Sequence, residues 1–287
     1  MKQESPVLDD VIRLIRKELM HHYPDREIQG FTDLIFDHLL DYSRTDILLN
    51  RDTKLSKSTF FQIKEIINQL LGNKPIQYIL GKAWFYGLKL KVSPDVLIPR
   101  QETEELVKWI IDDTGYSSVK LLDIGTGSGC IAVALAKNLH SSEVSATDIS
   151  EKALAIAEQN ARIAGTEIRL IHDDILDPVS ILSEKYDIIV SNPPYITESE
   201  KGLVDRNVLY FEPLTALFVP DENALLYYKA ITELARVTLN PRGRLYFEIN
   251  ENRADEVEEL LVRHLFRDIE IRKDINGKHR MVKAVFY

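Results

Sequence analysis

The N-terminal part of the chain carries apolar side chains at helical spacing. Between Val7 and about Leu71, apolar positions recur three or four residues apart, as in VIRLIRKELM, FTDLIFDHLLDYS and STFFQIKEIINQLL. Thr32 and Ser58 stand where helix N-caps are expected, and the segment GNKP then breaks the pattern. We therefore predict a small helical N-terminal domain over residues 1–72.

A linker with a different pattern follows over residues 73–101. It contains QYILGKAWFYGLKLKVSPDVLIPR, in which apolar and polar positions alternate around Gly81, Gly87 and Pro94. Alternation with a period of two, interrupted by turn residues, is typical of short antiparallel strands. We interpret this linker as a β-hairpin between two domains.

From residue 102 to 287, strand patterns and helix patterns alternate. Strands are predicted at VKLLDIG, EVSATDI, EIRLIHD, YDIIVSN and GRLYFEI, with helices such as CIAVALAKNL and KALAIAEQNARIAG between the first of them. This order is typical of a mostly parallel sheet covered by helices on both faces. Two further strand patterns joined around Asn276-Gly277 predict a C-terminal antiparallel hairpin. The expected fold class is α/β, with a Rossmann-like sheet after the small α-helical domain.

Composition narrows the class of protein without deciding its function. A formal net charge of −9 weighs against extended contact with nucleic acid phosphates. Cys130 is the single cysteine, which excludes an internal disulfide or a cysteine-cluster zinc site, and the histidines show no metal-ligand spacing. No uncharged apolar run approaches the ~18–20 residues of a membrane span, and the N-terminus lacks the order of a secretory signal. We expect a cytoplasmic monomer with no metal site and no membrane partner.

The stretch LLDIGTGSG is the first motif with chemical meaning. A predicted strand runs into a glycine-rich turn, where the backbone can approach a ligand closely before the next helix begins. The turn consists of Gly125, Thr126, Gly127, Ser128 and Gly129. Asp148 ends the following strand, where a carboxylate can accept hydrogen bonds from both hydroxyls of a ribose. The spacing Gly-x-Gly-x-Gly is that of S-adenosylmethionine-dependent methyltransferases, although this motif alone leaves NAD open.

The segment IHDDIL ends the third predicted strand of the sheet and would border an adenine ring in this strand order. Asp174 could accept a hydrogen bond from the exocyclic amine, and Ile175 could cover one face of the ring. Aspartate is also common in strand-end loops for reasons of turn geometry alone. The sequence leaves both interpretations open.

The segment SNPPYI follows the fourth predicted strand, so it faces the same crevice as the glycine turn. An amide or aromatic amine nitrogen is a poor nucleophile because its lone pair is delocalised. The Asn192 side-chain oxygen and the Pro193 carbonyl could accept hydrogen bonds from such an NH2 group, with Pro194 stiffening the turn and Tyr195 packing on the planar group. Together the two motifs indicate a nitrogen methyltransferase. Amines of DNA or RNA bases and glutamine side-chain amides all remain open as substrates at this point.

Three further stretches resemble one family. They resemble the HemK-type release factor glutamine methyltransferases, as do NPPY and the helical N-terminal domain. The three stretches are PIQYILGKAWFYGLKLKVSPDVLIPRQETEELV, FEPLTAL and KDINGKHR. The resemblance covers most of the chain. It implies that the enzyme methylates the glutamine side-chain nitrogen of the Gly-Gly-Gln motif in class 1 peptide chain release factors, and that the N-terminal helices dock this protein substrate.

The resemblance also assigns roles to residues. S-adenosylmethionine, which becomes S-adenosylhomocysteine, would be held by the turn from Gly125 to Gly129 with Asp148 and Asn192, and Ile175 would sit by the adenine. Asn192, Pro193, Pro194 and Tyr195 would bind the glutamine amide, with Asn192, Pro193 and Tyr195 as the catalytic set. An amino-methyltransferase of DNA or RNA bases would share both motifs, but the acidic balance opposes it. A binding module without activity would require the NPPY motif to be vestigial.

Overall fold

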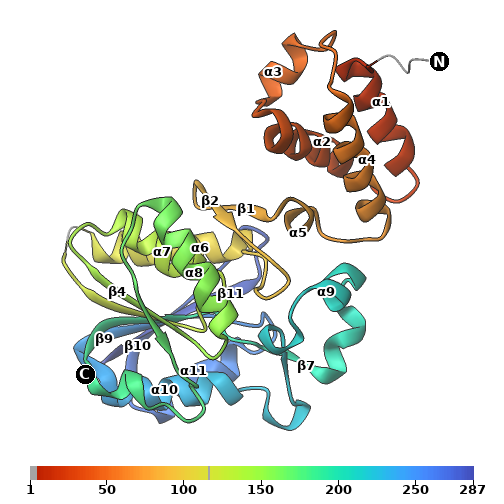
Figure 1. Cartoon of the computed structure of the whole chain (residues 1–287). Coiled ribbons are helices and arrows are strands. Elements are labelled where there is room, and N and C mark those ends of the chain that lie inside the picture. The colour runs from red at the N-terminus through yellow and green to blue at the C-terminus, as the bar shows by residue number, and fades with distance from the viewer. Residues whose placement is uncertain (1–4, 116) are drawn as a thin grey trace. The chain divides into compact units, whose positions relative to one another are not determined.

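The computed structural model describes residues 5–115 and 117–287, and their contacts divide into two units (Figure 1). The first unit contains the N-terminal helices as far as Gly81, together with residues 206–211. The second contains residues 82–205 and 212–287. The β-hairpin that follows Gly81 therefore belongs to the second unit.

The first unit is helical. Its elements are α1 (Leu8–Leu19), α2 (Asp25–Leu40), α3 (Arg44–Leu49), α4 (Lys57–Leu71), α5 (Ile76–Leu80) and the short α9 (Arg206–Phe211). Apolar residues at helical spacing bury one stripe of each of the longer helices, as Val11, Ile15 and Leu19 do on α1. These stripes meet in one apolar core. The Tyr23 hydroxyl donates to the Leu70 carbonyl at 2.6 Å, which connects the loop after α1 to the end of α4.

Both predicted N-caps of this unit are wrong. Helix α4 is capped by Ser56, whose hydroxyl accepts from the backbone N–H of Thr59 at 3.0 Å, so the helix begins before Ser58. Thr32 lies inside α2, because Pro24 supplies the extended residue that precedes that helix. The buried Thr32 hydroxyl instead donates to the carbonyl of Ile28 within the helix.

The second unit begins with the antiparallel hairpin of β1 (Lys82–Phe85) and β2 (Leu88–Lys91). Asn160 attaches this hairpin to the rest of the unit. Its side chain accepts from the Lys91 N–H at 2.6 Å and donates to the Lys91 carbonyl at 2.9 Å and to the Ser128 carbonyl at 2.8 Å. One buried carboxamide thus links the hairpin to the glycine turn.

The main sheet of this unit has the strand order β10-β11-β9-β6-β3-β4-β5 (Figure 1). Its strands are β3 (Lys120–Ile124), β4 (Glu143–Asp148), β5 (Arg169–His172), β6 (Tyr186–Ser191), β9 (Leu239–Glu248), β10 (Phe266–Lys273) and β11 (His279–Phe286). The run from β9 to β5 is parallel, and β11 is antiparallel to both of its neighbours, so the predicted C-terminal hairpin is confirmed. The chain leaves β3 towards β4 and later returns to β6 on the other side of β3. The topological switch point therefore lies between β3 and β6.

Helices cover both faces of this sheet. One core contains residues of α6 (Gln101–Thr114), α7 (Cys130–Asn138) and α8 (Glu151–Ala164), and the other contains residues of α10 (Leu226–Thr238) and α11 (Ala254–Arg263). Successive strand residues point to opposite faces, so Ile188 lies in the first core and Ile189 in the second. Such near-continuous apolar strands are typical of a parallel sheet buried on both sides.

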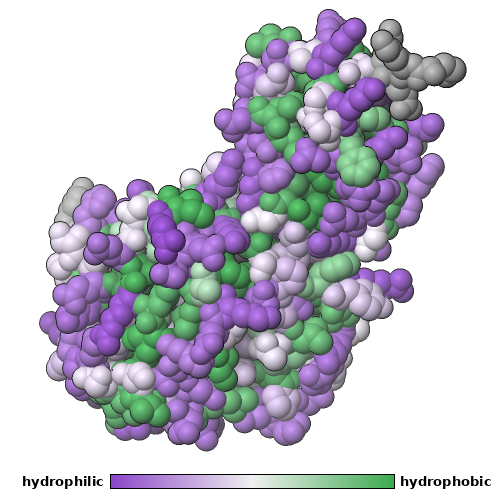
Figure 2. Space-filling model, in the orientation of Figure 1, coloured by the Kyte–Doolittle hydropathy of each residue, from purple (hydrophilic) through white to green (hydrophobic). Residues whose placement is uncertain are grey.

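Between β6 and α10 the chain forms β7 (Ile196–Thr197) and β8 (Phe218–Val219), which pair in parallel, with short 3-10 turns around them. On the face shown in Figure 2, hydrophilic residues are spread over both units with smaller hydrophobic areas between them. No helix in the described part of the chain has both the length and the apolar character needed to cross a membrane.

Candidate active site

A cavity of about 360 Å³ lies at the carboxyl ends of the parallel strands in the second unit. The turn after β3, the end of β4, the loop after β5 and the turn after β6 all contribute to its lining. This is the crevice in which open α/β sheets bind their ligands. Its volume lies in the usual range of small-molecule sites.

The glycine turn after β3 has the conformation that its sequence predicts. Gly127 and Gly129 have φ angles of 54° and 78°, which side chains with a Cβ rarely adopt. A Cβ on Gly129 would lie only 2.8 Å from the Cβ of Ala157, because the turn packs directly on α8. Gly125, Thr126, Gly127 and Ser128 line the cavity, whereas Gly129 lies behind it against α8.

Asp148 lies at the end of β4 and lines the cavity beside this turn. One carboxylate oxygen accepts from the Gly127 N–H at 2.8 Å, and the other accepts from the Ser150 N–H at 2.9 Å. Burial raises the pKa of Asp148, and these backbone donors oppose that rise. A carboxylate has further lone pairs for ligand hydroxyls, so Asp148 fits the ribose of a nucleoside cofactor.

Asp123 is a second carboxyl group behind the turn, and it is fully buried. The Thr126 hydroxyl donates to one of its oxygens at 2.6 Å. Burial, with a smaller contribution from the charge of Asp148, raises the pKa of Asp123 to about 7, and the hydrogen bond from Thr126 limits this rise. Asp123 therefore anchors the turn through Thr126, and its pKa lies near neutral pH.

The loop after β5 is held together by its own acidic side chains. The carboxylate of Asp173 accepts backbone N–H groups of Val179, Ser180 and Ile181 at 2.7–3.2 Å. Asp174 accepts from the N–H of Leu176 at 2.9 Å and lines the cavity. Asp174 thus makes the turn contact that the sequence allowed and also lines the cavity, and its hydrogen bond to an adenine amine stays a prediction.

Ile175 lies in the cavity wall and packs against the second core. Tyr227 of α10 lines the same cavity, and burial raises the pKa of its hydroxyl. Sequence reasoning missed Tyr227 because α10 follows a long irregular connection, and nothing local marks which of its faces borders the cavity.

The NPPY turn follows β6 at the topological switch point. The Ser191 hydroxyl donates to the Ile124 carbonyl at 2.6 Å, which joins the ends of β6 and β3. Asn192, Pro193 and Pro194 line the cavity, but Tyr195 is not part of the lining. The Tyr195 ring packs against the second core, and its hydroxyl donates to Glu248 at 3.2 Å.

Arg100 forms an ion pair and also borders the cavity. Its guanidinium donates to Glu212 at 2.6 Å, and the side chain also lines the cavity. The buried Glu212 accepts from the Ile98 N–H as well. This carboxylate connects the segments IPRQETE and FEPLTAL, which are far apart in the chain.

The chain matches two family models and is similar to several relatives. Residues 102–208 match the methyltransferase small domain, and residues 10–81 match the PrmC N-terminal domain. The release factor glutamine methyltransferase of Flavobacterium psychrophilum is 45% identical over 268 residues, which are 92% of this chain and 94% of the relative. That of Bacteroides thetaiotaomicron is 43% identical over 277 residues, covering 96% and 99%, respectively. The Streptococcus pneumoniae enzyme is 42% identical over 269 residues, covering 93% and 94%.

The chain is also similar in fold to solved structures. A Pyrococcus furiosus methyltransferase superposes with a TM-score of 0.51 and 19% identity over 76% of this chain and 96% of the other. A Thermus thermophilus 16S rRNA methyltransferase with bound AdoMet and guanosine has a TM-score of 0.52 and 17% identity, covering 72% of this chain and 50% of the other. At these identities the likeness shows the fold alone.

The strand order, the glycine turn after β3 and the acid that ends β4 define a class I methyltransferase that uses S-adenosylmethionine as methyl donor. The relatives narrow this class further. The chain belongs to the family of release factor glutamine methyltransferases.

Proposed function

We propose that this enzyme methylates the side-chain amide nitrogen of the glutamine in the Gly-Gly-Gln motif of class 1 peptide chain release factors. The observation that carries the proposal is the NPPY turn beside the glycine turn on one cavity, at the switch point between β3 and β6. The relatives named above supply the substrate class. We place the reaction in the cytoplasm, with a monomeric enzyme and no nucleic acid partner.

The cofactor would be held by residues that the cavity already brings together. S-adenosylmethionine, when bound, supplies an electrophilic methyl group and leaves as S-adenosylhomocysteine. Asp148 would accept the ribose hydroxyls, and the backbone from Gly125 to Ser128 would face the amino acid part. Ile175 and Tyr227 would cover the adenine, since both line the cavity near the loop after β5.

The substrate amide would be held by acceptors. The Asn192 side-chain oxygen and the Pro193 carbonyl each take one hydrogen of the glutamine NH2, which orients the nitrogen lone pair and increases its electron density. The two prolines fix the φ angles of the turn, so these acceptors need little reorganisation. A proton then leaves the methylated nitrogen for water, so the site needs no strong base. Contact between the Tyr195 ring and the amide stays a prediction.

The helical first unit would dock the release factor. Its support is the match of residues 10–81 to a domain of this family, and the separate apolar core that lets the unit fold around its own helices. We retain the proposed boundaries of a docking domain at 1–72, a linker at 73–101 and a catalytic domain at 102–287.

The test is methyl transfer from labelled S-adenosylmethionine to unmethylated class 1 release factor, with duplex DNA and ribosomal RNA in parallel. Label on the Gly-Gly-Gln glutamine, lost in Asn192→Ala, is the expected result. Asn138→Ala is the matched control, because the Asn138 amide donates to the Ala134 carbonyl at the end of α7 and lies outside the cavity lining. Label on nucleic acid alone would show that the substrate class is wrong.

A further inference from the structure

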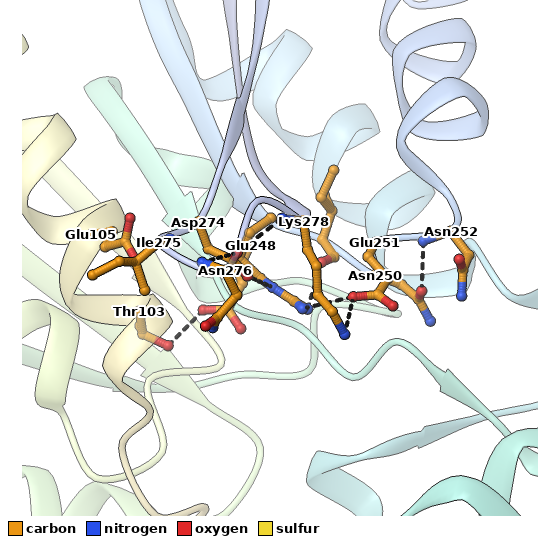
Figure 3. A network of polar contacts seen from close by, with 12 residues as sticks. Thr103, Glu105, Glu248, Asn250, Glu251, Asn252, Asp274, Ile275, Asn276 and Lys278 are labelled. Carbon is orange, nitrogen blue, oxygen red and sulfur yellow. Dashed lines mark hydrogen bonds and ion pairs between the residues drawn. The ribbon is translucent and has the colours of Figure 1, made fainter.

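A series of hydrogen bonds runs from Asn192 through Thr103, which both line the cavity, to the buried Glu248. The Asn192 Nδ2 group donates to Thr103 Oγ1 at 3.3 Å, and the Thr103 hydroxyl donates to Glu248 Oε2 at 2.5 Å. Figure 3 shows Thr103, at the start of α6, directed towards the carboxylate at the end of β9. The other oxygen of Glu248 accepts from the Tyr195 hydroxyl. One buried carboxylate therefore reaches both polar side chains of the NPPY turn.

The chemistry of Glu248 sets which group donates and which accepts in this series of hydrogen bonds. An ionised carboxylate can only accept, so the single hydroxyl proton of Thr103 points to Glu248. The Thr103 oxygen can then only accept from its other neighbour, which must be the NH2 end of the Asn192 carboxamide. With its nitrogen bound to Thr103, the carboxamide has its oxygen on the opposite side.

We propose that Glu248, acting through Thr103, is a positioning residue that fixes the orientation of the Asn192 carboxamide and so makes the site accept glutamine and reject glutamate. This inference rests on the proposed function. An Asn192 oxygen facing the substrate accepts from a glutamine NH2 group but opposes the oxygens of a glutamate carboxylate. A carboxamide turned by 180° would do the reverse, since it would offer NH2 to the substrate.

The surroundings of Glu248 raise the pKa of its carboxyl group above the ordinary value, and two neighbours that favour the ionised acceptor limit that rise. Burial raises the pKa of the carboxyl group, whereas the Thr103 hydroxyl and the positive charge of Arg280 oppose that rise. Arg280 is itself held by Asp274 at 3.2 Å and by the Ile249 carbonyl at 3.3 Å. Figure 3 shows the turn from Asp274 to Lys278 beside Glu248. Arg280 follows this turn in the KDINGKHR segment, and its positive charge acts on the Glu248 carboxylate.

The contacts are long-range, which separates this arrangement from local helix or turn structure. Asn192 and Thr103 are 89 positions apart in the chain, and Thr103 and Glu248 are 145 apart. Thr103 is buried, and its hydroxyl makes no bond to a carbonyl of its own helix, unlike Thr114 on the same helix, which donates to the Ile110 carbonyl. A hydroxyl at position 103 therefore serves the site and not the helix.

The test compares Thr103→Val, Thr103→Ser and the matched control Thr114→Val, which makes the same chemical change on the same helix. Each variant is first checked for binding of S-adenosylhomocysteine by calorimetry. For methylation of release factor, Thr103→Val is expected to lower kcat roughly 10- to 100-fold. Thr103→Ser keeps a hydroxyl between Asn192 and Glu248 and should retain kcat within about 3-fold. Thr114→Val should match the wild type.

The second readout does not depend on turnover. Release factor with the natural glutamine and release factor with Gln→Glu at that position compete for enzyme saturated with S-adenosylhomocysteine. The wild type is expected to bind the glutamine form more tightly, and Thr103→Val should reduce that ratio roughly 10-fold, because its Asn192 carboxamide can turn. Glu248→Met removes the acceptor and should reduce the same ratio, so it carries the test if Thr103→Val does not fold.

Two failures are distinguishable. A wild-type enzyme that labels no release factor overturns the proposed function. An active wild type whose Thr103→Val variant retains both kcat and the preference for glutamine overturns the positioning role of Thr103 and Glu248. Loss of activity in Thr103→Val with an unchanged binding ratio also overturns it, since a merely structural defect would have that effect.

Discussion

The carboxylate of Asp148 accepts a 2.8 Å hydrogen bond from the backbone N–H of Gly127, so the side chain assigned to the ribose also holds the glycine turn. The turn is further fixed from β4, because the N–H groups of Gly125 and Thr126 both donate to the Thr147 carbonyl at 2.9 Å. The end of β4 thus sets the shape of the turn that follows β3. The ends of two neighbouring strands, β3 and β4, therefore form the cofactor site together.

We expect Asp148→Asn to weaken S-adenosylmethionine binding about 10- to 100-fold, since a neutral amide offers one acceptor oxygen in place of two. Calorimetry of cofactor binding measures this effect. Glu151→Gln is the control, because it makes the same change on a nearby exposed side chain outside the cavity lining. Equal affinities of Asp148→Asn and the wild type would contradict the assigned role.

The two glycines of the turn differ in what surrounds them, and this gives a stability prediction. Gly127→Ala meets no atom within 4 Å, so it should cost only the left-handed backbone, about 1–2 kcal/mol. Gly129→Ala has the same backbone cost, and its Cβ would also lie 2.8 Å from Ala157 Cβ and 3.0 Å from Ala157 Cα. Gly129→Ala should therefore be the more destabilising change by a further ~1–3 kcal/mol.

Urea unfolding of the two variants decides this point. Combining Gly129→Ala with Ala157→Gly should recover part of the additional loss, because the nearest contact is with the Ala157 Cβ. Equal free energies of unfolding for the two single variants would show that the turn can move away from α8.

The raised pKa of Asp123 should make the free energy of unfolding depend on pH. Its folded-state pKa is about 7, above its ordinary value of 3.8, so the folded state binds this proton more tightly than the unfolded state. The free energy of unfolding should therefore fall as pH rises from about 4 to about 7, and the change should level off above that. Between pH 5 and pH 8 the loss from this group is about 2–3 kcal/mol.

Asp123→Asn does not titrate, so it should lack this loss. The difference in unfolding free energy between the variant and the wild type is expected to shift in favour of the variant as pH rises from 5 to 8. Urea unfolding at both values measures it. A constant difference would mean that Asp123 has an ordinary pKa despite its burial.

The sequence predicted those features of the fold and site that depend on local pattern. Strand β3 with its glycine turn, strand β6 with the NPPY turn, and the C-terminal hairpin each have a periodicity or a turn residue that marks them. The order of strands then placed Asp148 and Asn192 at the same edge of the sheet, as the structure shows.

Features that depend on contacts between distant segments could not be predicted in this way. Thr103 stands in an ordinary helix start, and Glu248 ends a strand of no special composition, so neither shows its link to Asn192. The hydroxyl of Tyr195 binds Glu248, and nothing in NPPY itself indicates this contact. The misplaced N-cap at Thr32 has a related cause, since a buried hydroxyl inside a helix can donate to its own backbone.

Arg280 and Lys278 provide the last prediction, because they are neighbouring cations with different surroundings. Both cations pair with Glu251, and Arg280 pairs in addition with Asp274. The side chains of Arg280 and Asp274 are 14% and 0% exposed, whereas that of Lys278 is 54% exposed. Arg280→Gln leaves a buried carboxylate without its cation and should cost about 2–4 kcal/mol in unfolding free energy. Lys278→Gln should cost no more than about 1 kcal/mol.

Catalysis should separate the same two variants. Arg280 opposes the rise in the pKa of Glu248, so its loss should let this carboxyl group take up a proton at higher pH. A protonated Glu248 can donate to Thr103, which would allow the relay to reverse and Asn192 to turn. As pH is lowered, kcat of Arg280→Gln should therefore begin to fall at a higher pH than kcat of Lys278→Gln, which leaves Arg280 in place. Superimposable profiles would show that the charge of Arg280 stabilises the C-terminal turn without reaching the catalytic amide.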